Sequence, residues 1–233
     1  RGRKDSVALH ESHAVTLLFI PLTILAGIFL LPLVQTVALW NENLPIGGAF
    51  GEWAREKEEA TRDLTLFLTQ FESPQEFLFA LFVMGVLAGV GEELLFRGLL
   101  QNQFRGIFGN VHVAILVSAI LFSAIHMQFF GFFARLLLGI WFGYLYHWTR
   151  NLWIPILAHF IHNSVTLTAV YLYQLNTVET NLDSTEYPPL ATILISMLIS
   201  GGLIYFIWTR RPKPPQTHHH PNDHVQTPDD ILG

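Results

Sequence analysis

Residues 85–104 read GVLAGVGEELLFRGLLQNQF, an apolar segment that contains two adjacent glutamates and an arginine. A charged side chain at the centre of a lipid bilayer costs at least about 2.5 to 3.5 kcal/mol on insertion scales. Glu92, Glu93 and Arg97 therefore need partners within the protein, a chemical role, or both.

The composition of the whole chain is that of a membrane protein. Of its 233 residues, 51% are hydrophobic and only 13% are charged, and the mean hydropathy is +0.40. Four uncharged runs are long enough to cross a bilayer as helices: residues 14–41, 106–134, 151–178 and 187–209. The chain has no cysteine, which excludes disulfides and thiolate chemistry. We expect an all-α, polytopic integral membrane protein that contacts lipid and no nucleic acid.

Six transmembrane helices are predicted, at roughly residues 14–40, 74–105, 111–128, 132–149, 152–173 and 188–208. The polar connector after the first helix contains GEWAREKEEATRD, which fits either an interfacial helix or a plain surface linker. We divide the chain into an N-terminal segment (1–13), the first helix with its connector (14–72), a core (73–173), the last loop and helix (174–210) and a tail expected to be disordered (211–233).

Basic residues predict the orientation, because they are enriched in cytoplasmic loops. With a cytoplasmic N-terminus, eight basic residues lie inside and three lie outside. The inner set is Arg1, Arg3, Lys4, Arg105, Arg150, Arg210, Arg211 and Lys213, and the outer set is Arg55, Lys57 and Arg62. Arg97 and Arg135 remain in or near the membrane. We therefore expect both termini to be cytoplasmic.

Four polar residues on three predicted helices lie at similar depth. At a rise of about 1.5 Å per residue, Glu92 lies roughly 20 Å from Arg105, and His126 lies roughly 20 Å from His112. By the same measure His159 lies roughly 13 Å beyond Arg150, and Asn163 lies one turn deeper. This agreement predicts that the four side chains form one site.

Helical spacing predicts which side chains pair. Glu93 and Arg97 are four residues apart in the order that favours an ion pair, so we expect them to be structural. Glu92 then has no dedicated cation, which suits a general base. His159 and Asn163 share one helical stripe. We expect packing or interfacial roles for His112, His147 and His162, and close helix contact at Gly139 and Gly143.

Three ordered motifs resemble those of the CAAX protease and bacteriocin-processing family of intramembrane endopeptidases, also called the Abi family. They are EELLFR (92–97), FSAIH (122–126) and HFIHN (159–163), and the resemblance covers about residues 73–173. It implies a helical core around a membrane-embedded cavity open to the cytoplasm, with a water activated for peptide hydrolysis. It also implies that Glu92 and His126 activate the water, that His159 and Asn163 stabilise the oxyanion, and that Glu93 and Arg97 support the site.

Several alternatives remain open at the level of sequence. Glu92, His126 and His159 form a set that could ligate zinc, and a metal-free glutamate mechanism fits the same residues. The substrate is a membrane-associated or transmembrane peptide, prenylated or not. A peptide-binding immunity protein and a proton- or cation-coupled transporter are the rival functions, although no inverted repeat supports a transporter. Zinc-protease, serine-protease and paired-aspartate motifs do not occur on the predicted membrane helices.

Overall fold

A computed structural model describes residues 13–178 and 186–212, with side chains from residue 17 onward. The predicted N-terminal segment and almost all of the predicted tail, including His218, His219, His220 and His224, lie outside these residues. Within the described ranges the chain is helical and has no strand. The all-α class expected from the sequence is confirmed.

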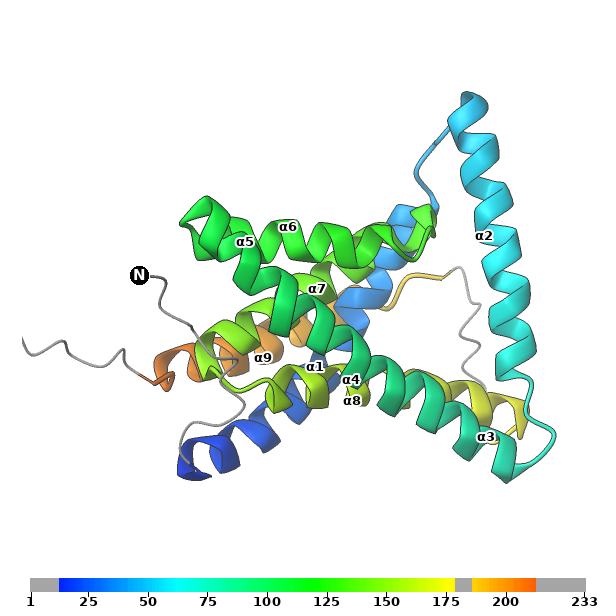
Figure 1. The fold of residues 1–233 in the computed structure, drawn as a ribbon. Helices are drawn as coiled ribbons and strands as arrows, with labels where there is room; N and C mark the ends of the chain where they lie inside the picture. Colours follow the sequence, from blue (N-terminus) through cyan, green and yellow to red (C-terminus); the bar gives the residue numbers. More distant parts are fainter. Residues whose placement is uncertain (1–12, 179–185, 213–233) are drawn as a thin grey trace, which may run out of the picture.

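Figure 1 shows how the helices follow one another along the chain. They are α1 (His13–Glu42), α2 (Gly48–Thr69), α3 (Pro74–Ala80), η1 (Leu81–Leu87), α4 (Ala88–Glu93), η2 (Leu94–Leu100), α5 (Gln101–Phe108), α6 (Val111–Ala124), the single turn η3 (Phe129–Gly131), α7 (Phe132–Thr149), α8 (Trp153–Gln174) and α9 (Leu190–Thr209). The six predicted membrane helices correspond to α1, α3 to α5, α6, α7, α8 and α9. The polar connector forms a helix, α2, and not a plain linker.

Four segments in the described part of the chain are long and apolar enough to cross a membrane: Leu17–Glu42, Pro74–Phe108, Phe129–Thr149 and Leu190–Thr209. The helix α6 is apolar but has only 14 residues. The 22-residue helix α8 contains two histidines and an asparagine, which lower its hydropathy. The protein is an integral membrane protein. Among the long helices of its bundle, α8 is the least apolar, and it carries candidate site residues.

The helix that contains the EELLFR motif is continuous over 35 residues, from Pro74 to Phe108. Its start is capped by Ser73, whose hydroxyl accepts a hydrogen bond from the Glu76 backbone. Two π-helical segments, η1 and η2, interrupt the α-helical geometry on either side of α4. Such wide turns are rare in proteins, and those that do occur are often found at functional sites. Glu92 and Glu93 therefore lie on a short α-helical piece between two irregular ones.

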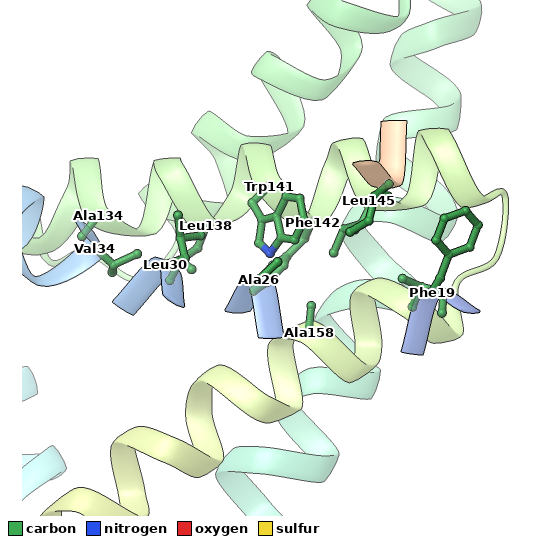
Figure 2. Close-up of a cluster of buried hydrophobic side chains, with 12 residues drawn as sticks. Phe19, Ala26, Leu30, Val34, Ala134, Leu138, Trp141, Phe142, Leu145 and Ala158 are labelled. Carbon is green, nitrogen blue, oxygen red and sulfur yellow. The ribbon is translucent and has the colours of Figure 1, made fainter. Parts of the chain in front are cut away.

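The main hydrophobic core lies between α1 and α7 (Figure 2). Side chains of α1 such as Ala26 and Leu30 face Leu138 and Trp141 of α7, and Ala158 of α8 lies next to them. Phe19 and Leu145 extend the cluster along both helices. The scaffold therefore holds α7 and α8 in fixed positions behind the candidate site.

The helix α2 stands apart from the bundle and runs across one of its ends (Figure 1). Near its N-terminus, Phe50 and Trp53 pack on Phe129, with ring centroids 5.2 and 5.1 Å apart. Near its C-terminus, the Gln174 side chain of α8 donates to the carbonyl oxygen of Thr69 at 2.6 Å. The helix is thus attached to the bundle at both of its ends.

Candidate active site

The four residues that the sequence placed at one depth line one cavity of about 730 Å³. Glu92 comes from α4, His126 from the turn after α6, and His159 and Asn163 from α8. The predicted convergence of three segments is therefore found in the structure. The remaining walls are mostly apolar and include Val83, Met84, Ala88, Leu138, Phe142, Leu167 and Val170.

Behind the cavity lies the expected ion pair. Arg97 Nη1 donates to Glu93 Oε1 at 2.7 Å, and both side chains are almost fully buried. Arg97 Nη2 donates to the carbonyl oxygen of Gly139 at 2.9 Å, and the guanidinium lies 4.7 Å from the centre of the Phe122 ring. The pair thus connects the EELLFR helix to α7 and to the FSAIH segment.

The same oxygen of Glu93 also contacts His159, which the sequence did not predict. His159 Nδ1 lies 3.0 Å from Glu93 Oε1, and the Phe142 ring stacks on the imidazole with centroids 5.0 Å apart. These contacts fix the plane of the imidazole and direct Nε2 toward Glu92. No spacing pattern could reveal a link between side chains 66 positions apart in the sequence.

Glu92 is the acid that remains available. Its Oε2 atom lies 3.9 Å from His159 Nε2 and is buried without a hydrogen-bond partner in the described structure. The side chain as a whole is 27% exposed, so it still reaches the cavity. Glu93 is neutralised by Arg97, whereas Glu92 has only this long contact with His159. The difference between the two neighbouring acids agrees with the sequence-based expectation.

His126 does not lie on a helix as predicted. The helix α6 ends at Ala124 and not at Gln128, because the chain turns there and Met127 has a left-handed φ of 55°. His126 lies in this turn and its Nδ1 lies 2.8 Å from the carbonyl oxygen of Phe122. When Nδ1 donates this bond, Nε2 is the free ring nitrogen.

Asn163 connects α8 to the first π-helical segment. Its Nδ2 atom donates to the carbonyl oxygen of Met84 at 2.8 Å. The backbones approach closely here because Gly85 and Gly89 have no side chains; a Cβ atom at Gly85 would lie 3.3 Å from the Phe160 ring. An amide nitrogen carries two hydrogens, so one N–H of Asn163 remains for the cavity.

Two further basic residues line the cavity, His162 and Arg135. The sequence analysis gave His162 a packing or interfacial role, and the structure places it on the cavity wall, one turn before Thr166. Arg135 was placed only in or near the membrane. Its position on the same helical face as Leu138 and Phe142, at spacings of three and seven residues, is the sequence signal that could have identified it.

The described residues do not support the zinc alternative in their present arrangement. No three His, Cys, Asp or Glu side chains within residues 13–178 and 186–212 are grouped so that they could share a metal ion. Glu92, His126 and His159 line one cavity without forming such a group.

The cavity extends from Glu92 to one end of the bundle. Its outer part is lined by Thr65 and Thr69 of α2, by Gln70 directly after this helix, and by Gln174 at the end of α8. In the opposite direction, fully buried side chains fill the bundle between the site and Arg105 or Arg150, among them Phe96, Leu145 and Leu152. The last described residues of α9 lie at the Arg105 end, away from α2 (Figure 1). The cavity thus extends toward α2 and away from the described end of α9.

Comparisons with known proteins point to one family. Residues 74–165 match the family model described as "Type II CAAX prenyl endopeptidase Rce1-like". Over 84 residues the chain is 31% identical to "Uncharacterized protein YpbD" of Bacillus subtilis (strain 168), an alignment that covers 34% of this chain and 40% of that protein.

Over 206 residues the chain is 26% identical to "Putative membrane peptidase YdiL" of the same bacterium, covering 87% of this chain and 69% of that protein. No solved structure matches. The family match contains all three motifs, from Glu92 to Asn163. The family match over residues 74–165 and the similarity to a protein named as a membrane peptidase confirm the resemblance expected from the motifs.

Proposed function

We propose that the protein is an intramembrane endopeptidase in which Glu92 activates a water molecule. The observation that carries this proposal is the free Glu92 carboxylate, which faces His159 Nε2 in a cavity shared with His126 and Asn163. A carboxylate base next to fixed hydrogen-bonding groups in a partly water-excluded site provides the parts that peptide hydrolysis requires.

The first step transfers a proton from water to Glu92. The resulting hydroxide forms a bond to the carbonyl carbon of the scissile peptide, and the carbonyl electron pair moves to its oxygen. His126 accepts a hydrogen bond from the same water through its free Nε2 and thereby orients it. When the tetrahedral intermediate collapses, the C–N bond breaks and Glu92 returns its proton to the leaving amine.

The negative charge on the oxygen of the tetrahedral intermediate is stabilised by hydrogen-bond donors that are held in position before the reaction begins. The second N–H of the Asn163 amide is one, because the first is held by Met84. His159 is the other, since its Nδ1 lies beside Glu93 Oε1 and its Nε2 faces Glu92 in the cavity. Glu93 and Arg97 act by positioning His159 and do not contact the substrate.

The walls of the cavity suit a membrane-associated peptide. Most of the lining is aliphatic or aromatic, and polar groups are concentrated near Glu92 and at the α2 end. The family description names a CAAX prenyl endopeptidase, and the name of YdiL gives a membrane peptidase. We infer a lipidated or transmembrane peptide as the substrate class, with CAAX-type peptides as its prenylated members.

The test compares Glu92→Gln with Asn163→Ala in the cleavage of a reporter peptide in detergent, with folding checked by thermal shift. Glu92→Gln keeps the size of the side chain but removes the base, so turnover is expected to fall to background. Asn163→Ala removes one oxyanion donor, which typically lowers kcat by about 100- to 1,000-fold and leaves measurable activity.

Near-normal turnover by a folded Glu92→Gln protein would overturn the proposal. Peptide capture without cleavage by the wild-type protein would instead favour the immunity or binding function, and pH-dependent transport in vesicles would favour the transporter.

A further inference from the structure

Basic residues from four parts of the chain meet at the end of the bundle that lies opposite α2 (Figure 1). They are centred on His147 of α7, which interacts electrostatically with Arg105 of α5, His112 of α6, Arg150 and Arg211. The imidazole rings of His112 and His147 have centroids 6.4 Å apart. These five residues are called the basic cluster below. The proposed hydrolysis uses none of them.

The side chains of the basic cluster are held in place and remain accessible. The Tyr144 hydroxyl lies 2.8 Å from His112 Nδ1, and Arg211 Nη1 donates to the carbonyl oxygen of Trp208 at 2.8 Å. The Arg211 guanidinium also lies 4.4 Å from the centre of the Trp208 ring. Arg105, His112 and Arg211 are exposed. A ligand can therefore reach them from outside the bundle.

No acid in the described structure neutralises the positive charge of the basic cluster. Within residues 13–178 and 186–212, no carboxylate oxygen lies within 4.0 Å of Arg105, Arg150 or Arg211. Arg97 differs, because its guanidinium pairs with Glu93 at 2.7 Å. Like charges held close together repel one another, so an anion that binds among them is favoured. The basic cluster thus has the charge of an anion-binding site.

Large apolar side chains next to the basic cluster are exposed. Ile107 and Phe108 follow Arg105 in α5 and are 71% and 47% exposed. Trp208, which contacts the Arg211 guanidinium, is 40% exposed. Tryptophan is enriched at the level of the lipid headgroups in membrane proteins. A ligand at this place can contact charged and apolar groups at once, which suits a phospholipid better than a free phosphate ion.

We propose that the basic cluster binds the anionic headgroup of a phospholipid, whose acyl chains lie along the exposed apolar side chains of α5. Guanidinium groups suit this ligand, because their planar donors match phosphate oxygens. The enrichment of basic residues in cytoplasmic loops requires only that they lie on one side of the membrane. Their convergence on one side chain, from segments far apart in the sequence, is the additional observation that indicates a site.

A lipid bound at the basic cluster would contact the ends of several helices together. Arg105 belongs to the continuous helix Pro74–Phe108, which also contains Glu92, and Arg150 directly follows α7. A ligand that binds only the folded state stabilises it. We therefore expect an anionic phospholipid to raise the thermal midpoint of the protein in detergent more than a zwitterionic one does.

The binding test uses phosphatidylglycerol and phosphatidylcholine with the same acyl chains. Each lipid is titrated into the whole chain in detergent, and native mass spectrometry measures the Kd of the first bound lipid. A basic residue near anionic headgroups typically strengthens binding about fivefold, so two contribute about 25-fold. We expect phosphatidylglycerol to bind at least about 25-fold more tightly than phosphatidylcholine. The Arg105→Gln, Arg211→Gln double variant should lose this preference and keep its affinity for phosphatidylcholine.

A matched double variant at the other end of the molecule separates a site from an effect of net charge. Lys57→Gln, Arg62→Gln removes the same charge from α2 and should keep the preference for phosphatidylglycerol. Without lipid, the thermal midpoint of Arg105→Gln, Arg211→Gln should equal that of the wild type or exceed it, because repulsion between like charges is reduced. An equal loss of preference in both double variants would overturn the proposal, and so would equal binding of the two lipids by the wild type.

Competition with inorganic phosphate distinguishes a lipid headgroup from a free phosphate as the ligand. Inorganic phosphate is added to the protein with phosphatidylglycerol bound, at the same concentration as the lipid. It should displace no lipid, because it gains nothing from the exposed apolar side chains beside the basic cluster. Displacement of phosphatidylglycerol under these conditions would identify a site for a free anion and overturn the assignment to a lipid.

Discussion

Glu93 Oε1 joins two parts of the site that the sequence shows separately. It accepts a hydrogen bond from Arg97 Nη1 at 2.7 Å and lies 3.0 Å from His159 Nδ1. A structural ion pair thereby determines how a proposed catalytic imidazole is oriented. Changes at Arg97 are therefore expected to affect the stability of the bundle and the geometry of the cavity together.

Arg97→Ala tests the structural role of this pair. The substitution leaves Glu93 buried without its cation and also removes the contact with Gly139, so the folding free energy should fall by about 3 to 5 kcal/mol. We expect a lower thermal midpoint in detergent and lower expression. Arg97→Lys keeps the positive charge but loses the second hydrogen bond of the guanidinium. Its thermal midpoint should therefore lie between those of the wild type and Arg97→Ala. Wild-type stability together with abolished turnover would instead identify Arg97 as a catalytic group.

At the scale of single residues, the sequence predicts contacts within a helix better than contacts between helices. The Glu93–Arg97 pair follows from a spacing of four, because helical geometry alone brings these side chains together. The Glu93–His159 contact and the cavity positions of His162 and Arg135 depend on how α7 and α8 pack against α4. Such packing depends on contacts between distant segments, which local patterns do not encode.

The ends of helices were predicted well where a residue such as glycine marks the end of an apolar run. The helix α7 spans residues 132–149 as expected, and α5 ends before Gly109, whose φ of 64° favours glycine. The early end of α6 was missed because neither glycine nor proline marks the turn at residues 125–128. The π-helical segments η1 and η2 were also missed, since no residue pattern distinguishes them from an α-helix of the same composition.

The contact between α6 and α7 depends on glycine, as the sequence predicted. A Cβ atom at Gly143 would lie 2.8 Å from Ile115 Cγ2 and 3.0 Å from Gln101 Oε1, and at Gly139 it would lie 3.0 Å from Ala119 Cβ. Gln101 also donates to the carbonyl oxygen of Gly143 at 3.1 Å. These glycines let α6 and the EELLFR helix approach α7 closely enough to close the bundle behind the cavity.

Gly143→Ala should therefore destabilise the protein, although alanine is the better helix former. Overpacking of this kind typically costs about 1 to 3 kcal/mol. The matched control is Gly106→Ala in α5, where an added Cβ atom meets nothing within 4 Å. The stability of this variant should equal that of the wild type or be slightly higher. The measurement is the thermal midpoint of both variants in one detergent. Equal midpoints would show that α6 can move away from α7 at little cost.

Carboxylates lie mainly at one end of the described structure, where α2 also carries Arg55, Lys57 and Arg62. Apart from Glu92 and Glu93, every described carboxylate lies in α2 or at the helix ends near it, including Glu42, Glu72, Glu76 and Glu186. The opposite end has Arg105, Arg150, Arg210 and Arg211 and, among the described residues, no carboxylate. Because basic residues favour the cytoplasmic side, the arginine end is expected to be cytoplasmic. The cavity, which extends toward α2, would then open on the other side of the membrane.

The absence of cysteine from the chain allows this orientation to be tested with single substitutions. Ala60→Cys places a thiol on the exposed surface of α2, Gly106→Cys places one at the arginine end, and Thr166→Cys places one in the cavity. A membrane-impermeant maleimide added to intact cells should label Ala60→Cys and Thr166→Cys but not Gly106→Cys. Permeabilised cells should label all three, and the cysteine-free chain should remain unlabelled. Labelling of Gly106→Cys alone would reverse the predicted orientation and place the cavity on the cytoplasmic side, where a substrate made in the cytoplasm could enter it directly.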